Sequence, residues 1–242
     1  MPALHSTNLL LDRLRPRHRA LVLGACDEVE LVPGQVIAEP GDAIADIYFP
    51  TDSAICLLTP MEDGHVVEVL LVGREGFYGV PVALGVPHSD VRAVVQGPGK
   101  ALRMSSSAFR TRLGAQADVH LADGVSLYIQ VLMGQLAQAV GCNRFHRVEQ
   151  RVARWLLMTS DRTAASSFAL THELLARTLG VRRVGVTEAA GALQRKRLIA
   201  YKRGMVTILD ARGLERAACS CYRADLQLYD RALAAPVKRN PG

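Results

Sequence analysis

The residues at 171–193, THELLARTLGVRRVGVTEAAGAL, decide the fold of the C-terminal part of the chain. Thr171 is a suitable N-cap for a first helix, and Gly180 supplies the left-handed backbone that a tight turn between two helices requires. Ala176 is small enough for a close crossing of the two helices, and Val186 brings the second helix back to the core. This spacing predicts a helix-turn-helix.

The second helix of this motif has a polar face that we do not expect to be buried in a core. Arg183 can pair with a guanine through two hydrogen bonds, Val184 can contact a thymine methyl group, and Glu188 can accept a hydrogen bond from a cytosine amino group. We expect this face to enter the major groove of duplex DNA. The candidate DNA-binding residues of the motif are Thr171, Arg182, Arg183, Val184, Thr187 and Glu188.

The charge of the chain is divided unevenly. Residues 1–143 hold 10 Lys and Arg against 15 Asp and Glu, whereas residues 144–242 hold 19 against 8. The net charge of +6 therefore comes entirely from the C-terminal part. Because clustered cations release counterions from nucleic acid on binding, this asymmetry favours a polyanionic partner over a merely solvated basic face.

A short hairpin is expected directly after the motif. Apolar runs at 198–201 and 205–209 flank Lys202-Arg203-Gly204, so two cations, Lys202 and Arg203, lie at its tip and would contact phosphates. The alternative is an ordinary helical pair beside a hairpin. The turn residues, the cationic tip and the basic charge of this part agree with one another, and they favour a winged helix-turn-helix.

Upstream, residues 29–104 consist of short β-branched runs separated by turn residues, among them Pro33-Gly34, Pro40-Gly41-Asp42 and Gly97-Pro98-Gly99. This pattern is typical of an antiparallel sandwich, and a jelly roll fits best. The expected strands include Ala54–Leu58, His65–Val72 and Val91–Gln96.

Helical periodicity occurs at four further places. We expect a lead-in helix at Leu9–Gly24, a short Ser-capped helix at Ser106–Leu113, a long amphipathic helix at Ala117–Asn143 and another helix at His146–Ser160. Apolar residues of the long helix have coiled-coil spacing, which predicts a dimer seam or, alternatively, a stripe that packs on the sandwich. The seam residues are Val125, Ile129, Leu132, Leu136, Ala139 and Asn143.

These elements together predict an α+β fold. It has an N-terminal antiparallel β jelly roll, a long dimerisation helix and a C-terminal winged helix-turn-helix. The expected boundaries are 1–24 for the lead-in, 25–114 for the jelly roll, 115–144 for the dimerisation helix and 145–242 for the DNA-binding domain.

Several classes of function lack support in the sequence. No 18 apolar residues run together and no secretory signal precedes the domains, so we expect a cytoplasmic protein without a membrane partner. The five cysteines show no CxxC spacing, which argues against a disulfide framework. The nucleophile, zinc-protease and P-loop motifs are all missing, so we expect no enzyme.

The order of these parts resembles the Crp/Fnr superfamily of bacterial transcription regulators over nearly the full chain. The residues that carry the resemblance are Gly34, Gly41-Asp42, Tyr48-Phe49, Gly73-Arg74-Glu75-Gly76 and Thr171–Leu193 with the following wing. The resemblance implies a homodimer joined through the long helix, a palindromic DNA operator and RNA polymerase as a partner. It also implies that the jelly roll is a cyclic-nucleotide-binding-like domain with an effector pocket.

That pocket departs from relatives that bind cyclic AMP. They have an Arg-Ser pair where this chain reads Pro87-His88-Ser89-Asp90, and Asp90 would repel a phosphate. We expect no cyclic AMP in that pose, with Arg92 or Arg74 as the alternative anion partners. The effector is therefore unknown. The candidate pocket residues are Gly73, Arg74, Glu75, Ser89, Arg92, Gln135 and Gln138.

The sequence also gives reasons to expect neither an iron–sulfur cluster nor another metal. Relatives with such a cluster have several cysteines near the N-terminus, whereas the first 25 residues here have none. His65, His88 and His120 are haem-ligand candidates by residue type alone. Cys219 and Cys221 would need further ligands to hold a metal, so a packing role is favoured for them.

Two alternatives to an effector-controlled regulator stay open. The β domain could be a degenerate support for constitutive DNA binding, or the chain could be a cyclic-nucleotide-responsive regulatory module, which leaves the wing unexplained. If an effector binds, we expect a two-state dimer whose long helices change register and move the DNA-binding domains to operator spacing.

Overall fold

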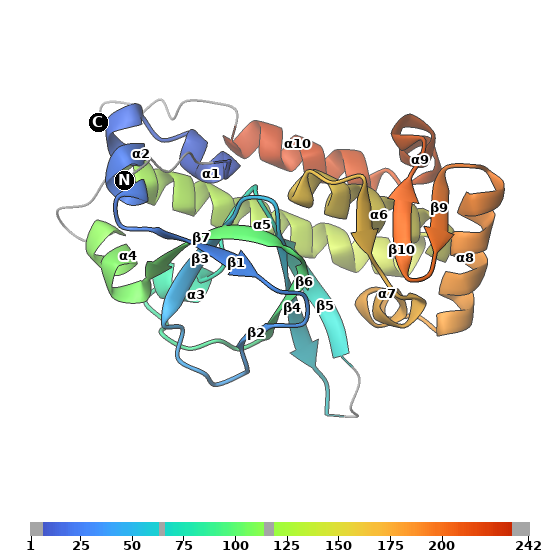
Figure 1. Ribbon diagram of the computed structural model, residues 1–242, viewed down its shortest axis with the longest axis horizontal. Coiled ribbons are helices and arrows are strands. Elements are labelled where there is room, and N and C mark those ends of the chain that lie inside the picture. The colour runs from blue at the N-terminus through green and yellow to red at the C-terminus, as the bar shows by residue number, and fades with distance from the viewer. Residues whose placement is uncertain (1–6, 63–65, 114–118, 234–242) are drawn as a thin grey trace.

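An antiparallel β sandwich forms the N-terminal part of the molecule (Figure 1). The computed structural model describes residues 7–62, 66–113 and 119–233. Both sheets pair antiparallel throughout, which confirms the predicted sandwich. One sheet has the order β1 (Asp27–Leu31), β7 (Gly99–Ser105), β3 (Asp46–Pro50), and the other has the order β2 (Val36–Ala38), β6 (Arg92–Gly97), β4 (Ala54–Pro60), β5 (Val66–Val72).

The sandwich core follows the two-residue period of its strands. Ile47 and Phe49 alternate on β3 and are fully buried, while Asp46 and Tyr48 are only partly buried. Phe49 meets Phe77 at a ring-centroid distance of 5.6 Å. Two short helices, α3 (Val80–Ala83) and α4 (Ser106–Leu113), close this end of the core.

The expected single lead-in helix is wrong. The chain forms α1 (Leu9–Asp12) and α2 (Pro16–Leu23) instead. Pro16 disfavours helical backbone at the preceding residue, and Arg15 is indeed extended there. Asn8 fixes α1 in place, because its side-chain amide donates to the backbone oxygens of Pro50 and Gly76 at 2.9 and 2.8 Å.

The long helix α5 (Val119–Phe145) crosses the molecule and joins its two parts (Figure 1). Leu121, Val125, Tyr128 and Leu132 are buried in the sandwich core. By length and composition alone, His120–Phe145 could cross a membrane, a feature that the search for uninterrupted apolar runs missed. A single helix of this kind is weak support for a membrane span, because core helices of soluble proteins pass the same test.

A second core lies in the C-terminal part, beyond α5. It contains Trp155 of α6 (Val148–Thr163) and Val206 of β10 (Met205–Ile208), and the sheet order is β8 (Ser167–Ala169), β10, β9 (Ile199–Lys202). The remaining elements are α7 (His172–Leu179), α8 (Arg183–Arg195), α9 (Ala211–Ala217) and α10 (Cys221–Leu233). The last helix returns along α5 (Figure 1).

Candidate functional site

The helix-turn-helix is formed by α7 and α8. Thr171 caps α7 by accepting a hydrogen bond from the backbone N–H of Leu174 at 3.0 Å. Gly180 ends α7 with a φ of 60°, the left-handed conformation that the sequence predicted at this turn. Ala176 and Val186 are buried between the helices and the second core. These four residues therefore have the capping, turn and packing positions that the sequence predicted.

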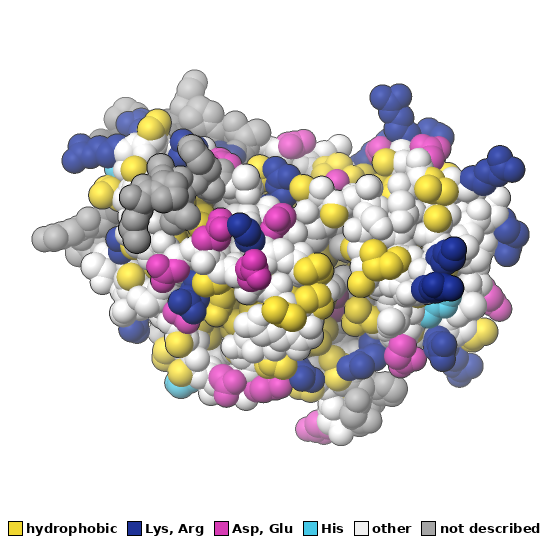
Figure 2. Space-filling view, viewed as in Figure 1, with side chains coloured by type: hydrophobic (Ala, Val, Ile, Leu, Met, Phe, Trp, Pro, Cys, Tyr) yellow, Lys and Arg dark blue, Asp and Glu magenta, His cyan; other side chains and the backbone are white. Residues whose placement is uncertain are grey.

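The predicted recognition face of α8 points to solvent. Arg182 is the N-cap of α8, and Arg183 is its first residue. The exposed residues of this face are Arg182, Arg183, Val184, Thr187 and Glu188. Figure 2 shows Lys and Arg side chains gathered at the end of the molecule where α8 and the β9–β10 hairpin lie in Figure 1. A polyanion would meet this end of the molecule first.

A polar contact that the sequence did not predict supports this face. The ring nitrogen Nδ1 of His172 lies 3.0 Å from the hydroxyl of Thr187, and that hydroxyl donates to the backbone oxygen of Arg183. His172 also stacks on Tyr201 of β9, with ring centroids 4.5 Å apart. Burial and the nearby Arg183 charge lower the pKa of His172. The neutral ring therefore joins α7, α8 and the wing.

The wing is a two-residue hairpin. Lys202 pairs with Met205, so Arg203 and Gly204 alone form the turn. Their φ values, 51° and 77°, are the successive left-handed conformations of the turns that best fit strand twist. Lys202 and Arg203 are both exposed, as a phosphate-contacting tip requires.

A groove borders the start of α8. It has a volume of about 790 Å³ and lies between β5 and the helix-turn-helix, where Val66 and Val67 face Arg182 and Arg183. Arg177 of α7 is exposed beside the same groove and is a further cation that the sequence argument left out. Its helical position, on the polar side of α7, was the signal that could have found it.

The predicted effector residues are separated in the structure. Glu75 and Gln135 do meet, but through Arg162 of α6, which the sequence did not indicate. The guanidinium Nε of Arg162 lies 3.1 Å from a carboxylate oxygen of Glu75, and its Nη2 donates to the side-chain oxygen of Gln135 at 3.4 Å. Burial opposes the charge of Arg162, yet the Glu75 carboxylate raises the pKa of Arg162. This buried ion pair links the β domain to the C-terminal domain.

Gly73, in the turn after β5, allows α6 to lie close to the β domain. A Cβ on Gly73 would lie 2.4 Å from the Cβ of Arg162, so only glycine fits there. The backbone N–H of Arg74 donates to the backbone oxygen of Arg162 at 3.1 Å. Gly73, Arg74 and Glu75 thus form a joint between domains in this conformation.

The other effector candidates have different partners. Ser89 is buried, and its hydroxyl donates to the backbone oxygen of Val91 at 2.7 Å. Arg92 forms an ion pair with Glu39 at 3.1 Å. Gln138 donates to the sulfur of Cys221 at 2.9 Å. The seven residues are therefore not one site. Among the haem-ligand candidates, His65 lies outside the described residues.

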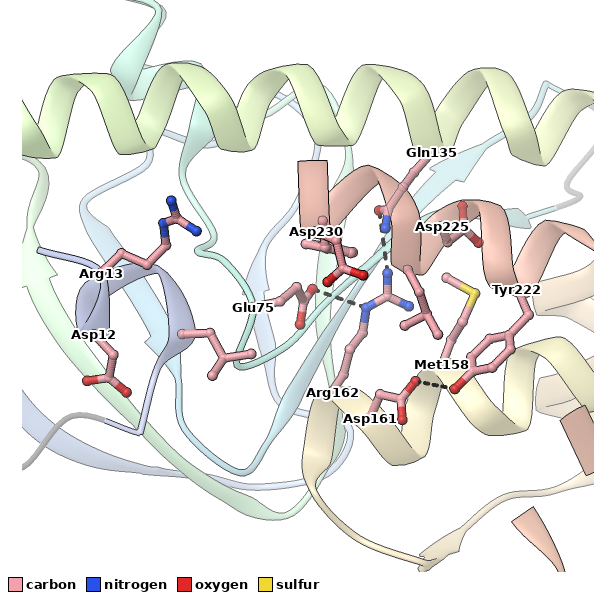
Figure 3. A pocket seen from close by; sticks show the side chains of 13 residues that line it. Asp12, Arg13, Glu75, Gln135, Met158, Asp161, Arg162, Tyr222, Asp225 and Asp230 are labelled. Carbon is pink, nitrogen blue, oxygen red and sulfur yellow. Dashed lines mark hydrogen bonds and ion pairs between the residues drawn. The ribbon is translucent and has the colours of Figure 1, made fainter. Parts of the chain in front are cut away.

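A cavity of about 500 Å³ lies beside the Glu75–Arg162 pair, between α1, α6 and α10 (Figure 3). Its wall is largely apolar, and its charged groups are mostly carboxylates. Burial raises the pKa of Asp161, which accepts a hydrogen bond from the Tyr222 hydroxyl at 2.8 Å. The charged residues that line it are Asp12, Arg13, Glu75, Asp161, Arg162, Asp225 and Asp230. This excess of carboxylates disfavours a phosphorylated ligand.

Glu68 of β5 forms a second link between the domains. Its carboxylate accepts hydrogen bonds from the indole N–H of Trp155 at 3.1 Å and from the hydroxyl of Thr178 at 3.3 Å. The thiol of Cys56 donates to it from within the sandwich at 2.9 Å. Burial raises the pKa of Glu68. The β domain therefore holds both α6 and α7 through one acidic side chain.

The comparisons with known proteins agree with this architecture. Residues 150–217 match the family model of the Crp-like helix-turn-helix domain. The structure also aligns with FixK2 from Bradyrhizobium japonicum, at a TM-score of 0.67 and 14% sequence identity, over 81% of this chain and 98% of that one. The chain has the fold of the Crp/Fnr regulators. No curated protein sequence matches it.

Two further structures with the Crp/Fnr fold have similar scores. The regulator TTHA1359 of Thermus thermophilus, of the CRP/FNR family, aligns at a TM-score of 0.62 and 23% identity, over 79% of this chain and 98% of that one. The c-di-GMP-responsive global regulator CLP of Xanthomonas campestris aligns at 0.64 and 13% identity, over 80% of this chain and 99% of that one. The resemblance read from the sequence is confirmed at the level of fold.

The residues of the expected dimer seam differ in their exposure on α5. Val125 and Leu132 are buried by the chain's own sandwich, so they are unavailable to a partner. Leu136 and Asn143 of the expected seam are exposed, so part of the stripe packs on the β domain and part of it does not. The apolar side chains that α5 exposes are Met133, Leu136, Val140 and Phe145.

Proposed function

We propose that this Crp/Fnr-fold protein is a sequence-specific, DNA-binding transcription regulator. The observation that carries the proposal is the exposure of Arg182, Arg183, Val184, Thr187 and Glu188 on one face of α8, next to the cationic tip of the wing. The opposite face of α8, with Val186 and Leu193, is fully buried. A helix held in this way offers base-reading side chains without loosening its own core.

The regulator acts as a homodimer in this proposal, and its operator is a palindrome. The exposed apolar face of α5 supports pairing, because contiguous apolar side chains on a helix favour a partner over water. Two recognition helices would then reach half-sites about one helical turn, ~10 base pairs, apart. The protein works in the bacterial cytoplasm with RNA polymerase as its further partner and without a membrane.

Selection of bound duplexes from a random DNA pool tests the proposal. We expect an enriched motif with two-fold symmetry and half-site spacing near one turn. The full chain should be used, at low salt, with a pool of matched length and composition as the competitor. A pool that shows no enrichment after repeated rounds would contradict sequence-specific binding, whereas an asymmetric motif would contradict the paired arrangement.

Constitutive DNA binding, without control by an effector, is the second candidate function. It is favoured by the way the expected pocket is occupied: Glu75 is paired with Arg162, and Arg92 with Glu39. The carboxylate-rich cavity gives no support to cyclic AMP, nor to the c-di-GMP response described for CLP. Operator affinity measured with and without small molecules from a bacterial extract separates the two. An unchanged affinity supports constitutive binding.

A further inference from the structure

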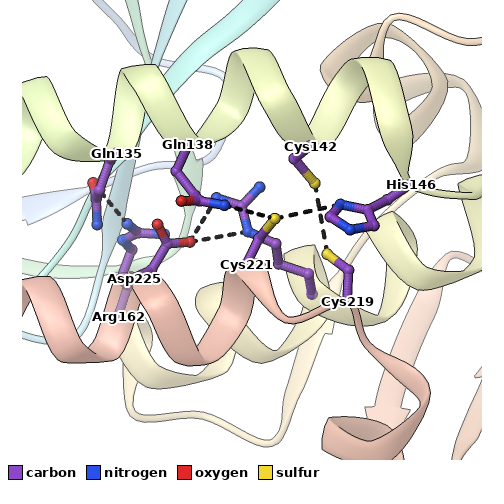
Figure 4. Close-up of polar contacts among 9 residues, drawn as sticks. Gln135, Gln138, Cys142, His146, Arg162, Cys219, Cys221 and Asp225 are labelled. Carbon is purple, nitrogen blue, oxygen red and sulfur yellow. Dashed lines mark hydrogen bonds and ion pairs between the residues drawn. The ribbon is translucent and has the colours of Figure 1, made fainter.

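Four potential metal ligands meet where the DNA-binding domain joins α5 (Figure 4). Cys142 lies near the end of α5, and His146 follows it by one helical turn, just beyond Phe145. Cys219 lies between α9 and α10, and Cys221 is the first residue of α10. Their ligand atoms all lie within 4.8 Å of one another. The sequence had left Cys219 and Cys221 without further ligands, and the fold brings them two.

The separations fit a single ion. The sulfurs of Cys142 and Cys219 are 3.6 Å apart, and the sulfur of Cys221 is 3.4 Å from the Nδ1 atom of His146. A tetrahedral zinc site with ordinary Zn–S and Zn–N bonds has edges of about 3.8 Å between sulfurs and about 3.6 Å between sulfur and nitrogen. The ligands of an iron–sulfur cluster surround several atoms and lie farther apart, so these four are too close together for one.

The surroundings also suit a metal centre with thiolate ligands. All three cysteines are buried, which keeps competing water away. The side-chain amide of Gln138 donates a hydrogen bond to the sulfur of Cys221 at 2.9 Å, as outer-shell groups do for metal-bound sulfur. Arg154 is close enough to act electrostatically on Cys142, and Asp225 holds it through contacts of 2.9 and 2.6 Å. Three thiolates around Zn²⁺ leave one negative charge, which the field of the nearby Arg154 favours even though Asp225 shares that guanidinium.

We propose that Cys142, His146, Cys219 and Cys221 bind one Zn²⁺ ion in a closed, four-coordinate site. This assignment is independent of the proposed DNA binding. The ion would join the end of α5 and the residue just beyond it to Cys219 and the start of α10, and Cys219 is 77 positions from Cys142 in the sequence. The DNA-binding domain is thereby fixed to the long helix at two points instead of one. Ligands of this number and softness describe a structural metal site.

Metal binding by the full chain tests the assignment. The protein is purified with a non-thiol reductant, stripped with a chelator and titrated with Co²⁺, and then with Zn²⁺. We expect one ion per chain, the visible bands of tetrahedral cobalt and a strong sulfur-to-cobalt charge-transfer band that Zn²⁺ abolishes. Free zinc at about 100 times its Kd should raise Tm by about 5–10 °C.

Variants locate the ion. Cys219→Ser should lose the charge-transfer band and the Tm response, whereas Cys26→Ser, which changes a buried cysteine elsewhere, should retain both. His146→Cys replaces one ligand with another and should keep one ion per chain with a stronger charge-transfer band. A wild-type chain that binds no metal would show that these are packing cysteines. Unchanged binding by Cys219→Ser, or a weaker band in His146→Cys, would equally overturn the assignment.

Discussion

In the proposed function, Arg183 is the residue of α8 that is best placed to read a base. It is exposed at the first residue of the helix, where a recognition helix approaches base edges. Arg183→Ala should lower affinity for the selected operator by about 1–3 kcal/mol and relax the base preference at one position of each half-site. Fluorescence anisotropy with the operator and with single-base variants measures both effects.

The matched control is Arg110→Ala, which removes the same charge from an exposed position on α4. It should leave the binding motif and its information content unchanged. Selection of the same motif by Arg183→Ala, with the same strength at every position, would contradict base reading by this residue. A loss of affinity with an unchanged motif would indicate a phosphate contact instead.

Glu68 gives a pH dependence of known sign. Because burial raises its pKa in the folded chain, the ionised carboxylate costs folding free energy at neutral pH. Below the ordinary glutamate pKa, about 4.3, the group is neutral in both states and the cost disappears. Glu68→Gln should therefore raise Tm relative to the wild type at pH 7–8, by less and less as the pH falls toward 4. Thermal melts across this range test it.

Glu62→Gln is the control, because Glu62 is exposed near the same strand. Its Tm should follow that of the wild type at every pH. A Glu68→Gln chain that is less stable than the wild type at pH 7–8, by an amount that shrinks as the pH falls toward 4, would show the opposite balance: the charged hydrogen bonds to Trp155 and Thr178 would then outweigh the cost of burying the carboxylate.

The structural role of a residue could be predicted from the sequence where its partners lie within a few positions of it. The roles of Thr171 and Gly180 follow from capping and turn chemistry within a few positions, and the structure has both. Arg162 could not be found in this way, since its partners Glu75 and Gln135 are 87 and 27 positions away. The same holds for the Cys142–Cys219 contact, which depends on α10 returning along α5.

At the scale of elements, the wing should act through charge alone. Lys202 is exposed at the end of β9, beside the turn of the hairpin, where we expect it to contact a phosphate rather than a base edge. Lys202→Ala should weaken binding to all duplexes about equally and reduce the slope of log affinity against log salt by about 1. Affinities for the operator and for unrelated DNA over a range of salt concentrations give this slope. A sequence-dependent loss would contradict the assignment.

Elements differed in what their periodicity could predict. β-Branched runs bounded by turn residues predicted β4, β5 and β6 to within one or two residues at each end, because turn residues mark where a strand stops. The periodicity of α5 predicted the helix but not its environment, since three surfaces compete for it. Val125 and Leu132 pack in the sandwich core, Gly134 lies against Leu228 of α10, and Val140 is exposed to solvent. The helical period alone does not show which face of α5 packs on the sandwich, which packs on α10 and which stays exposed.

In the whole molecule, the DNA-binding domain is docked on the β domain. Glu75–Arg162 and Glu68–Trp155 hold it there, and β5 borders the groove beside the start of α8. A duplex seated on α8 would have to share this groove with β5. The two-state mechanism expected from the sequence therefore has identifiable contacts to break: an effector that favours the undocked state must outweigh two buried polar links.

The same arrangement makes the pairing of chains testable, because α5 exposes its apolar side away from both domains. Val140 is 71% exposed and Met133 is 61% exposed. Val140→Arg places a charge in the proposed interface, where its desolvation would not be repaid, so the dimer should dissociate at least tenfold more readily in sedimentation equilibrium. Leu84→Arg, at a similarly exposed position beyond α3, should not change the association. Equal association of both variants would place the interface elsewhere. An operator affinity that falls with the dimer, at unchanged Tm, would show that two recognition helices must bind together.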